Sequence, residues 1–255
     1  MGRAAPRNLQ DLADRLGFSV ATVSLVLNGR ARALRISPRT EARIQRAAER
    51  YGIQPNRLAA SLRSGRTASI GLVVPDVANP FFAALAQHLE RALRYSGLVV
   101  LLADSEESVA LEERSLRELR DRRVDGMIVA PVDGRNPLLA KLAAEGFPLV
   151  CLDRVSPDLS VPQVSTDHAG AARLAVEALL AAGHRRIGCL RATPGVFSDD
   201  DRVRGYREAL HAAGISPRAT WIDGGDFTRP TARAAAERLL ERGEVTAIVP
   251  LAGQA

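Results

Sequence analysis

The stretch LQDLADRLGFSVATVSLVLNG, residues 9–29, decides the fold of the first quarter of this 255-residue chain. Asn8 can cap a first helix and Gly17 ends it. Its apolar residues follow the helical i, i+3, i+4, i+7 spacing: Leu9, Leu12, Ala13 and Leu16. Ser19 is placed to cap a second helix, which the sequence predicts over residues 20–27. Two short helices joined by a tight turn indicate a helix-turn-helix unit.

A third helix completes this unit. Ser37 is a capping residue followed by Pro38 at the first helical position, and the pattern runs to Tyr51, where Gly52 ends it. The apolar face of this helix consists of Ile44, Ala47, Ala48 and Tyr51. The sequence therefore predicts an all-α domain of three helices at the N-terminus.

The distribution of charge sets this domain apart from the rest. Residues 1–66 contain 13 arginines, no lysine and four carboxylates, which gives a net charge of +9. The other 189 residues hold 22 basic and 25 acidic groups, a net charge of −3. A charged run alone is usually a solvated face, but a basic helix-turn-helix on a mildly acidic body indicates a nucleic-acid-binding module.

From Ser69 onward the pattern alternates between apolar strands and amphipathic helices. Strands are expected at residues 70–74, 98–103, 126–130, 149–152, 187–190 and 247–249, with helices at 81–95, 108–120, 137–145, 169–182, 202–213 and 231–241. Continuous apolar strands that alternate with helices predict an α/β body with a doubly wound parallel sheet. A break with two prolines at residues 153–162 divides this body into two lobes. The expected domains are 1–55, 56–66, 67–156 and 157–255.

Further short motifs follow residues 9–29 in order along the chain: Ser37-Pro38-Arg39-Thr40, Pro55-Asn56-Arg57, Ser61-Leu62-Arg63, Ile70-Gly71-Leu72-Val73-Val74-Pro75, Asn79-Pro80-Phe81-Phe82 and Gly183-His184-Arg185-Arg186-Ile187-Gly188. This colinear series covers nearly the whole chain and closely resembles the LacI/GalR (lactose-repressor/galactose-repressor) family of transcriptional regulators. The resemblance implies a DNA-binding headpiece on a two-lobed body like that of periplasmic binding proteins.

The second helix carries the expected DNA-reading face. Its buried face should be Val23, Val26 and Leu27, and its opposite face can enter a major groove: Val20, Ala21, Ser24, Leu25 and Asn28. By resemblance, the base-reading positions are Val20, Ala21 and Leu25. The family commonly has arginine where Leu25 stands, and leucine offers only apolar contact, for example with a thymine methyl group. Phosphate contacts are expected from Ser19, Thr22, Ser24 and Asn28, although Ser19 can equally serve only as a helix cap.

The segment from Asn56 to Gly65 matches the family's linker, which folds into a hinge helix on DNA and wedges a leucine into the minor groove. The matching residue is Leu62, and such a wedge unstacks one base step. Spacing alone would favour an ordinary apolar linker residue, and the resemblance reverses that preference. The DNA contacts expected here are Asn56, Arg57, Leu62 and Arg63, with Arg66 beside them.

A small-molecule pocket is expected in the loops that follow the strands of the body. By resemblance its residues are Asn79, Phe81, Phe82, Asp153, Asp167, Ser198, Arg202 and Phe227. Each has a plainer interpretation. Phe82 can belong to the core, Asp153 and Asp167 can cap helices, and Arg202 can pair with the acidic run at residues 199–201. That run could also suggest a metal, but a solvated loop is preferred.

Other classes of function find no support in the sequence. It contains no glycine-rich phosphate loop, no Gly-x-Ser-x-Gly elbow and no cluster with metal-ligand spacing, so no enzyme, cofactor or metal is expected. No stretch reaches the roughly 20 apolar residues that span a bilayer, and no secretion signal follows Met1. Cys151 and Cys189 lie in apolar runs, which suits reduced thiols of a cytoplasmic protein better than a disulfide.

The end of the chain departs from the family pattern. In the family, a strand like residues 245–249 precedes further chain that completes the second lobe, whereas here the sequence ends at Ala255. The second lobe is therefore expected to be incomplete, which affects effector binding and dimerisation.

The function expected is that of a sequence-specific DNA-binding regulator, a repressor controlled by a small metabolite, with a sugar as the leading effector class. Its partners would be an operator duplex, the effector and a second copy of the chain. A periplasmic sugar-binding protein shares the two-lobed body, but the basic headpiece argues against it. A doubly wound enzyme lacks a catalytic constellation.

Overall fold

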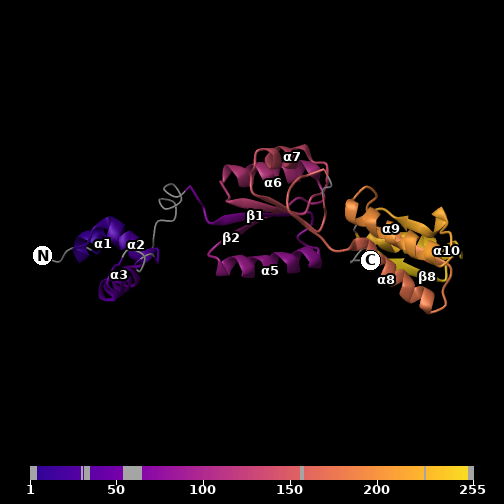
Figure 1. Cartoon of the computed structure of the whole chain (residues 1–255), viewed down its shortest axis with the longest axis horizontal. Helices are drawn as coiled ribbons and strands as arrows, with labels where there is room; N and C mark the ends of the chain where they lie inside the picture. The colour runs from indigo at the N-terminus through magenta and orange to yellow at the C-terminus, as the bar shows by residue number, and fades with distance from the viewer. Residues whose placement is uncertain are drawn as a thin grey trace. The chain divides into compact units, whose positions relative to one another are not determined.

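The computed structural model describes residues 5–29, 31, 35–53, 65–155, 158–226 and 228–251. The chain divides into two compact units, Met1–Thr67 and Ala68–Ala255, which are drawn in order along the chain in Figure 1. No described helix is long and apolar enough to cross a membrane.

The first unit contains three helices, α1 (Leu9–Leu16), α2 (Val20–Leu27) and α3 (Pro38–Tyr51). Each begins at the expected cap, because the side chains of Asn8, Ser19 and Ser37 accept a hydrogen bond from the third residue beyond them. Gly17 and Gly52 end α1 and α3 in the left-handed conformation. One apolar cluster holds the three helices together: Leu12, Ala13, Val23, Val26, Ala31, Ile44 and Ala48.

The first lobe of the second unit contains a parallel sheet of order β2-β1-β3-β4-β5. Its strands are β1 (Ser69–Val74), β2 (Val99–Asp104), β3 (Gly126–Val129), β4 (Leu149–Leu152) and β5 (Gln163–Val164), and its helices are α5 (Pro80–Tyr95), α6 (Val109–Asp121) and α7 (Pro137–Ala144). The apolar strands and the alternation with helices produce the doubly wound arrangement that the sequence predicts.

The two faces of this sheet are covered by different helices. Because side chains alternate along a strand, Val73 of β1 faces α6 and α7, whereas Leu72 and Val74 face α5 and its Phe82. Figure 1 shows α6 and α7 on one side of β1 and α5 on the other. Helices on both faces leave the carboxyl edge of the sheet as the place where loops gather.

The loop with two prolines does not end the first sheet. Cys151 donates its backbone N–H to the carbonyl of Pro162, and β5 then pairs in parallel with β4. The strand pairing of the first lobe therefore continues past the boundary that the sequence suggests at 156/157. The prolines mark a connection between adjacent strands.

The second lobe has a parallel sheet of order β7-β6-β8, formed by β6 (Ile187–Arg191), β7 (Ile222–Gly224) and β8 (Ala247–Pro250). Its helices are α8 (His168–Ala181), α9 (Phe197–Ala212) and α10 (Arg229–Glu241), and a short 3-10 turn, η2 (Ala219–Trp221), precedes β7. Helices α8 and α9 pack on each other and on β6 around the buried Tyr206, whose hydroxyl donates to the carbonyl of Ile187. Helix α10 packs on β7 and β6.

Helix α9 begins five residues earlier than its apolar periodicity suggests, because Ser198 and the acidic run lie in its first turns. Its approach to α8 is very close. A Cβ added at Gly205 would lie 2.1 Å from the carbonyl oxygen of Ala169. Only glycine allows this helix crossing, which fixes the position of the first turns of α9.

The two cysteines are free thiols in different cores, Cys151 in the first lobe and Cys189 in the second. Burial raises the pKa of Cys151 to about 11 and that of Cys189 to about 12. Both thiols are therefore protonated at neutral pH and act as core residues.

Candidate functional site

Helix α2 presents part of the outward face that the sequence predicts, because Val20 packs partly against the headpiece core. Val23 and Val26 are buried in the headpiece core, whereas Ala21 and Asn28 are exposed. Val20 and Leu27 pack partly against the core, while Leu25 is half-buried and lies outside that cluster. Ala21, Leu25 and Asn28 thus form a small, mostly uncharged surface on this helix.

Polar residues at the two ends of α2 are engaged in local hydrogen bonds. The Ser19 hydroxyl accepts from the Thr22 N–H at 3.1 Å and lies 2.8 Å from the Thr22 hydroxyl. Asn28 donates its amide to the Ser24 carbonyl at 2.7 Å. Ser19 is therefore a helix cap, a role compatible with a phosphate contact. The expected DNA contacts Asn56, Arg57, Leu62 and Arg63 lie outside the described residues.

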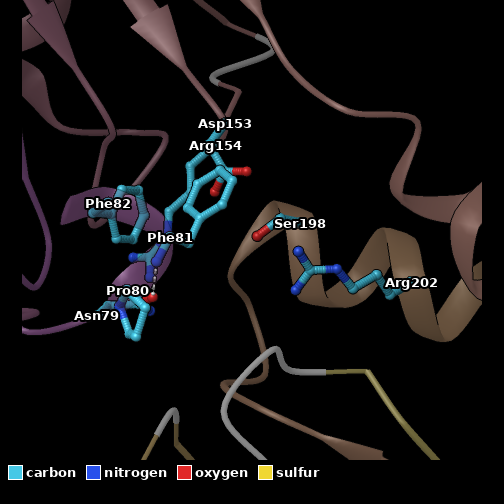
Figure 2. Close-up of a pocket in the computed structure, with 8 residues that line it drawn as sticks. All are labelled: Asn79, Pro80, Phe81, Phe82, Asp153, Arg154, Ser198 and Arg202. Atoms are coloured by element: carbon cyan, nitrogen blue, oxygen red, sulfur yellow. Dashed lines mark hydrogen bonds between the residues drawn. The ribbon is translucent and has the colours of Figure 1, made fainter. Parts of the chain in front are cut away.

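Six of the eight residues expected in the pocket line one cavity of about 150 Å³ in the body. Asn79, Phe81 and Phe82 come from the start of α5, Asp153 from the loop after β4, and Ser198 and Arg202 from α9. Pro80 and Arg154 complete the lining. In Figure 2, Ser198 and Arg202 extend from α9 toward the residues of the first lobe. All three segments follow the carboxyl end of a parallel strand, where α/β sheets bind ligands.

Two phenylalanines in succession have different surroundings. Phe82 is 3% exposed and packs in the core beneath the sheet, while Phe81 is 49% exposed. Their rings meet edge to face with centroids 5.1 Å apart. Phe82 is therefore mainly a core residue. Phe81 offers an accessible apolar surface at the cavity.

Asp153 lies at the centre of a tight three-residue turn. The N–H of Arg154 donates to the carbonyl of Leu152 at 2.6 Å, and Asp153 has a φ of +60°. Ser165 and His168 both make hydrogen bonds to the Asp153 carbonyl, at 2.7 and 3.2 Å. This left-handed backbone is uncommon outside glycine, and it is held in place from the second lobe. Asp153 does not cap a helix.

Arg202 is partly buried on α9, and it has neither a hydrogen bond nor an ion pair among the described residues. Burial lowers the pKa of Arg202, and the carboxylates of Asp153 and Asp199 partly offset this effect. The arginine remains charged at neutral pH because its ordinary pKa is far higher. Its guanidinium group is available to donate hydrogen bonds into the cavity.

Arg154, unlike Arg202, is engaged in an ion pair. It is 4% exposed and donates two hydrogen bonds to the Glu107 carboxylate, at 2.7 and 2.6 Å. Its guanidinium carbon also lies 6.0 Å from the centroid of the Phe82 ring. Arg154 is not among the residues that the sequence predicts for the pocket. Only its position directly after Asp153 could have indicated it.

A second cavity of about 530 Å³ adjoins the first through this ion pair, because Arg154 lines one and Glu107 the other. Its lining combines loops of both lobes: Pro75, Asp76, Asp104, Glu106, Glu107, Val132, Thr193, Val196, Asp226 and Thr228. Five of these ten residues are acidic and none is basic. The periodicity of the sequence gave no sign of this acidic region.

Two of the residues expected in the pocket are not among its described lining residues. Asp167 is not among the lining residues, and its carboxylate accepts the Gly170 N–H at 2.8 Å, so it caps α8 as the plainer interpretation held. Phe227 lies outside the described residues.

The acidic run at residues 199–201 is not a solvated loop, since it lies in the first turns of α9. In the part of the chain that the structure describes, its hydrogen bonds go to residues other than Arg202, although the charge of Asp199 acts on the Arg202 guanidinium group. Asp199 is fully buried, and it accepts hydrogen bonds from Arg191 and from the N–H of Ala192 at 2.7 Å. Asp201 pairs with Arg204 and also accepts the N–H of Ala169 at 3.1 Å. These carboxylates join α9 to β6 and to α8. Within the described residues, no cluster suited to a metal ion occurs.

The fold and these two sites define a helix-turn-helix headpiece joined to a two-lobed α/β binding body. Residues 8–56 match the model of bacterial regulatory proteins of the lacI family. Residues 67–254 match the model of periplasmic binding proteins and the sugar-binding domain of the LacI family.

Individual relatives agree with these matches. Catabolite control protein A of Priestia megaterium is 30% identical over 92% of this chain and 70% of its own. The sucrose operon repressor of Klebsiella pneumoniae is 33% identical over 86% of this chain and 65% of its own. A crystal structure of the lac repressor dimer, bound to operator and an anti-inducer, superposes with a TM-score of 0.83 and 25% identity, over 96% of this chain and 73% of that chain.

This protein belongs to the LacI family of bacterial regulatory proteins. It is a transcriptional regulator of that family and not an enzyme. The chain spans about two thirds of the length of the two curated relatives named above.

Proposed function

We propose that this protein is a cytoplasmic repressor that binds an operator duplex as a homodimer and changes its affinity for DNA when a sugar occupies the pocket of the body. One observation carries the proposal: side chains from three separate strand ends meet in one cavity, whose lining includes an available arginine and a carboxylate. Mixed donors and acceptors beside an aromatic ring suit a small polar ligand.

For the DNA-binding half, we propose that the outward face of α2 reads bases in the major groove through Val20, Ala21 and Leu25, with phosphate contacts from Ser19, Thr22, Ser24 and Asn28. The net charge of +9 in residues 1–66 supplies the electrostatic attraction. The proposed domains are a headpiece at 1–55, a hinge at 56–66 with DNA contacts from Asn56, Arg57, Leu62 and Arg63, and a body whose lobes divide after β5.

For the sensing half, the proposed contacts are Asn79, Phe81, Phe82, Asp153, Ser198 and Arg202. The matched family model is named for a sugar-binding domain, and one relative is named for a sucrose operon, which supports a sugar as the effector class. Because the pocket residues come from both lobes, a ligand there favours one arrangement of the lobes over another.

The test measures linkage between the two sites. A fluorescent duplex, selected from a random pool by the full chain, is titrated with protein in the presence of glucose, fructose, galactose or ribose. The proposal expects one of these sugars to change the dissociation constant for DNA at least fivefold, the range of ordinary allosteric coupling. Arg202→Ala should abolish that change. Arg207→Ala, at an exposed position of the same helix, is the matched control and should retain it.

A further inference from the structure

We infer that the effector is an uncharged sugar with free hydroxyl groups, and that the pocket rejects the phosphorylated form of the same sugar. This inference rests on the proposed function and specifies the ligand class of its pocket. It is carried by the charges around the two adjoining cavities.

The positive charges of the pocket are already balanced by carboxylates. Arg154 is held by Glu107 through two hydrogen bonds, at 2.7 and 2.6 Å. Arg202 lies near the carboxylate of Asp153, whose charge acts on its guanidinium group. Asp153 lines the pocket together with Arg154 and Arg202, and Glu107 lines the adjoining cavity. The charges of these two arginines and two carboxylates sum to zero, so the Arg154–Glu107 pair leaves little positive charge for an anionic ligand.

The neighbouring cavity makes the region negative. Besides Glu107, its lining contains Asp76, Asp104, Glu106 and Asp226, and none of its described lining residues is basic. Hydrogen bonds from Thr228 lower the pKa of Asp226, which keeps that carboxylate ionised at neutral pH. A sugar phosphate carries a charge of about −1.5 to −2 at pH 7 and would be repelled by these groups.

The hydrogen-bonding capacity of the pocket also fits hydroxyl groups. Arg202 can only donate hydrogen bonds and the Asp153 carboxylate can only accept them. A hydroxyl group does both, so neighbouring hydroxyls of one sugar ring can satisfy the two residues together. A phosphate group only accepts, and it would leave Asp153 facing another anion.

The other lining residues of the pocket also fit an uncharged sugar. The exposed half of the Phe81 ring offers a flat apolar surface to the C–H face of a sugar ring, and the amide of Asn79 and the hydroxyl of Ser198 add polar groups at the cavity. Phosphate sites in proteins usually converge several cations or backbone N–H groups on one anion. Among the described lining residues, Arg202 is the arginine available to a ligand, and the Asp153 carboxylate lines the same cavity.

The experiment is a calorimetric titration of the full chain with four matched pairs: glucose and glucose 6-phosphate, fructose and fructose 6-phosphate, galactose and galactose 1-phosphate, ribose and ribose 5-phosphate. The inference expects that every sugar that binds does so at least tenfold more tightly than its phosphorylated partner. It is overturned if a phosphorylated member binds as tightly as its parent, an outcome that leaves the sugar-sensing function intact. If no member of any pair binds, the sugar-sensing function fails and the inference fails with it.

A variant tests the cause of the discrimination. Asp153→Asn keeps a side chain that tolerates the left-handed turn but removes the negative charge. This variant should bind the uncharged sugar about tenfold more weakly than the parent protein does. Its preference for the uncharged sugar over the phosphorylated partner should also be smaller. Asp158→Asn, an exposed carboxylate that pairs with Arg135 nearby, is the control and should change neither value. An unchanged preference in Asp153→Asn would show that this charge does not set the specificity.

Discussion

Arg154 and Glu107 tie together two loops that leave the first sheet at strands separated by two others. Arg154 follows β4 and Glu107 follows β2, and the sheet order places β1 and β3 between them. The arginine is 4% exposed and donates two hydrogen bonds to one carboxylate. The pair therefore fixes the edge of the sheet against which the candidate effector pocket is built.

Removal of this carboxylate should destabilise the body. Glu107→Gln leaves a buried guanidinium group with a neutral partner, and we expect the free energy of unfolding to fall by about 2 kcal/mol. Urea denaturation followed by circular dichroism measures the change.

The matched control is Glu90→Gln, which breaks an equally bidentate pair with Arg94 on the exposed face of α5. Solvent screens that pair, so its loss should lower the free energy of unfolding much less than the loss of the Arg154–Glu107 pair. If the free energy of unfolding falls equally in the two variants, burial does not make the Arg154–Glu107 pair more stabilising than an exposed pair.

The close crossing of α8 and α9 gives a second prediction. In Gly205→Ala the added methyl group would lie 2.1 Å from the Ala169 carbonyl oxygen, so one helix must move. We expect a loss of about 3 kcal/mol, at the upper end of overpacking effects. Gly188→Ala is the control, because its Cβ would make ordinary contacts with Val245 at 3.4 Å. A small effect at Gly205 would show that the two helices separate easily.

A buried carboxyl group predicts a pH dependence of stability. Glu112 is fully buried on α6 and accepts hydrogen bonds from the Val132 N–H at 2.7 Å and from the Asn136 amide at 2.6 Å. Burial raises the pKa of Glu112 to about 7, above its ordinary value of 4.5. The unfolded chain then loses this proton at lower pH than the folded chain. The free energy of unfolding should therefore fall by about 3 kcal/mol from this group as the pH rises from 4.5 through 7.

Glu112→Gln removes the titrating group. The free energy of unfolding of this variant should therefore not show the fall that Glu112 causes in the parent protein between pH 4.5 and 8. Glu118→Gln, an exposed position on the same helix that pairs with Arg114, should keep the parent's pH dependence. Urea midpoints measured across this pH range provide the comparison. Parallel curves for the parent and Glu112→Gln would assign the pH dependence to other groups.

Leu25 gives a prediction about sequence preference. Leucine offers bases only apolar contact, whereas arginine can donate two hydrogen bonds to guanine, which is worth about 1–3 kcal/mol of discrimination. Leu25→Arg should therefore change the DNA motif recovered by selection from a random pool. Gln45→Arg adds the same charge at an exposed position of α3 and should preserve the motif. Identical motifs from the parent and Leu25→Arg would mean that this position does not face the bases.

The sequence predicted those parts of the molecule in which local signals agree. The caps Asn8, Ser19 and Ser37 and the apolar spacing of residues 9–29 determine the three headpiece helices, and apolar strands alternating with helices determine the doubly wound body. Resemblance to the family brought Asn79, Phe81, Phe82, Asp153, Ser198 and Arg202 together correctly, because they follow strands whose carboxyl ends meet.

The errors arose where long-range contacts override local patterns. The acidic first turns of α9 have no apolar periodicity, yet Asp199 is buried because Arg191 of β6 neutralises it. The prolines between β4 and β5 resembled a boundary although backbone pairing continues across them. The ion pair of Arg154 and the acidic cavity were not predicted, because the residues that form them, such as Glu107, lie far away in sequence.

Sequence-specific binding of DNA by this protein is tested by the ratio of two dissociation constants. The full chain is titrated by fluorescence anisotropy against a duplex selected from a random pool and against a duplex with the same bases in shuffled order, in the same salt. The account predicts that the selected duplex binds at least 100-fold more tightly, since specific regulators usually exceed their nonspecific binding by about 10³ or more. Equal affinity for the two duplexes would contradict the assignment of this chain as a sequence-specific regulator.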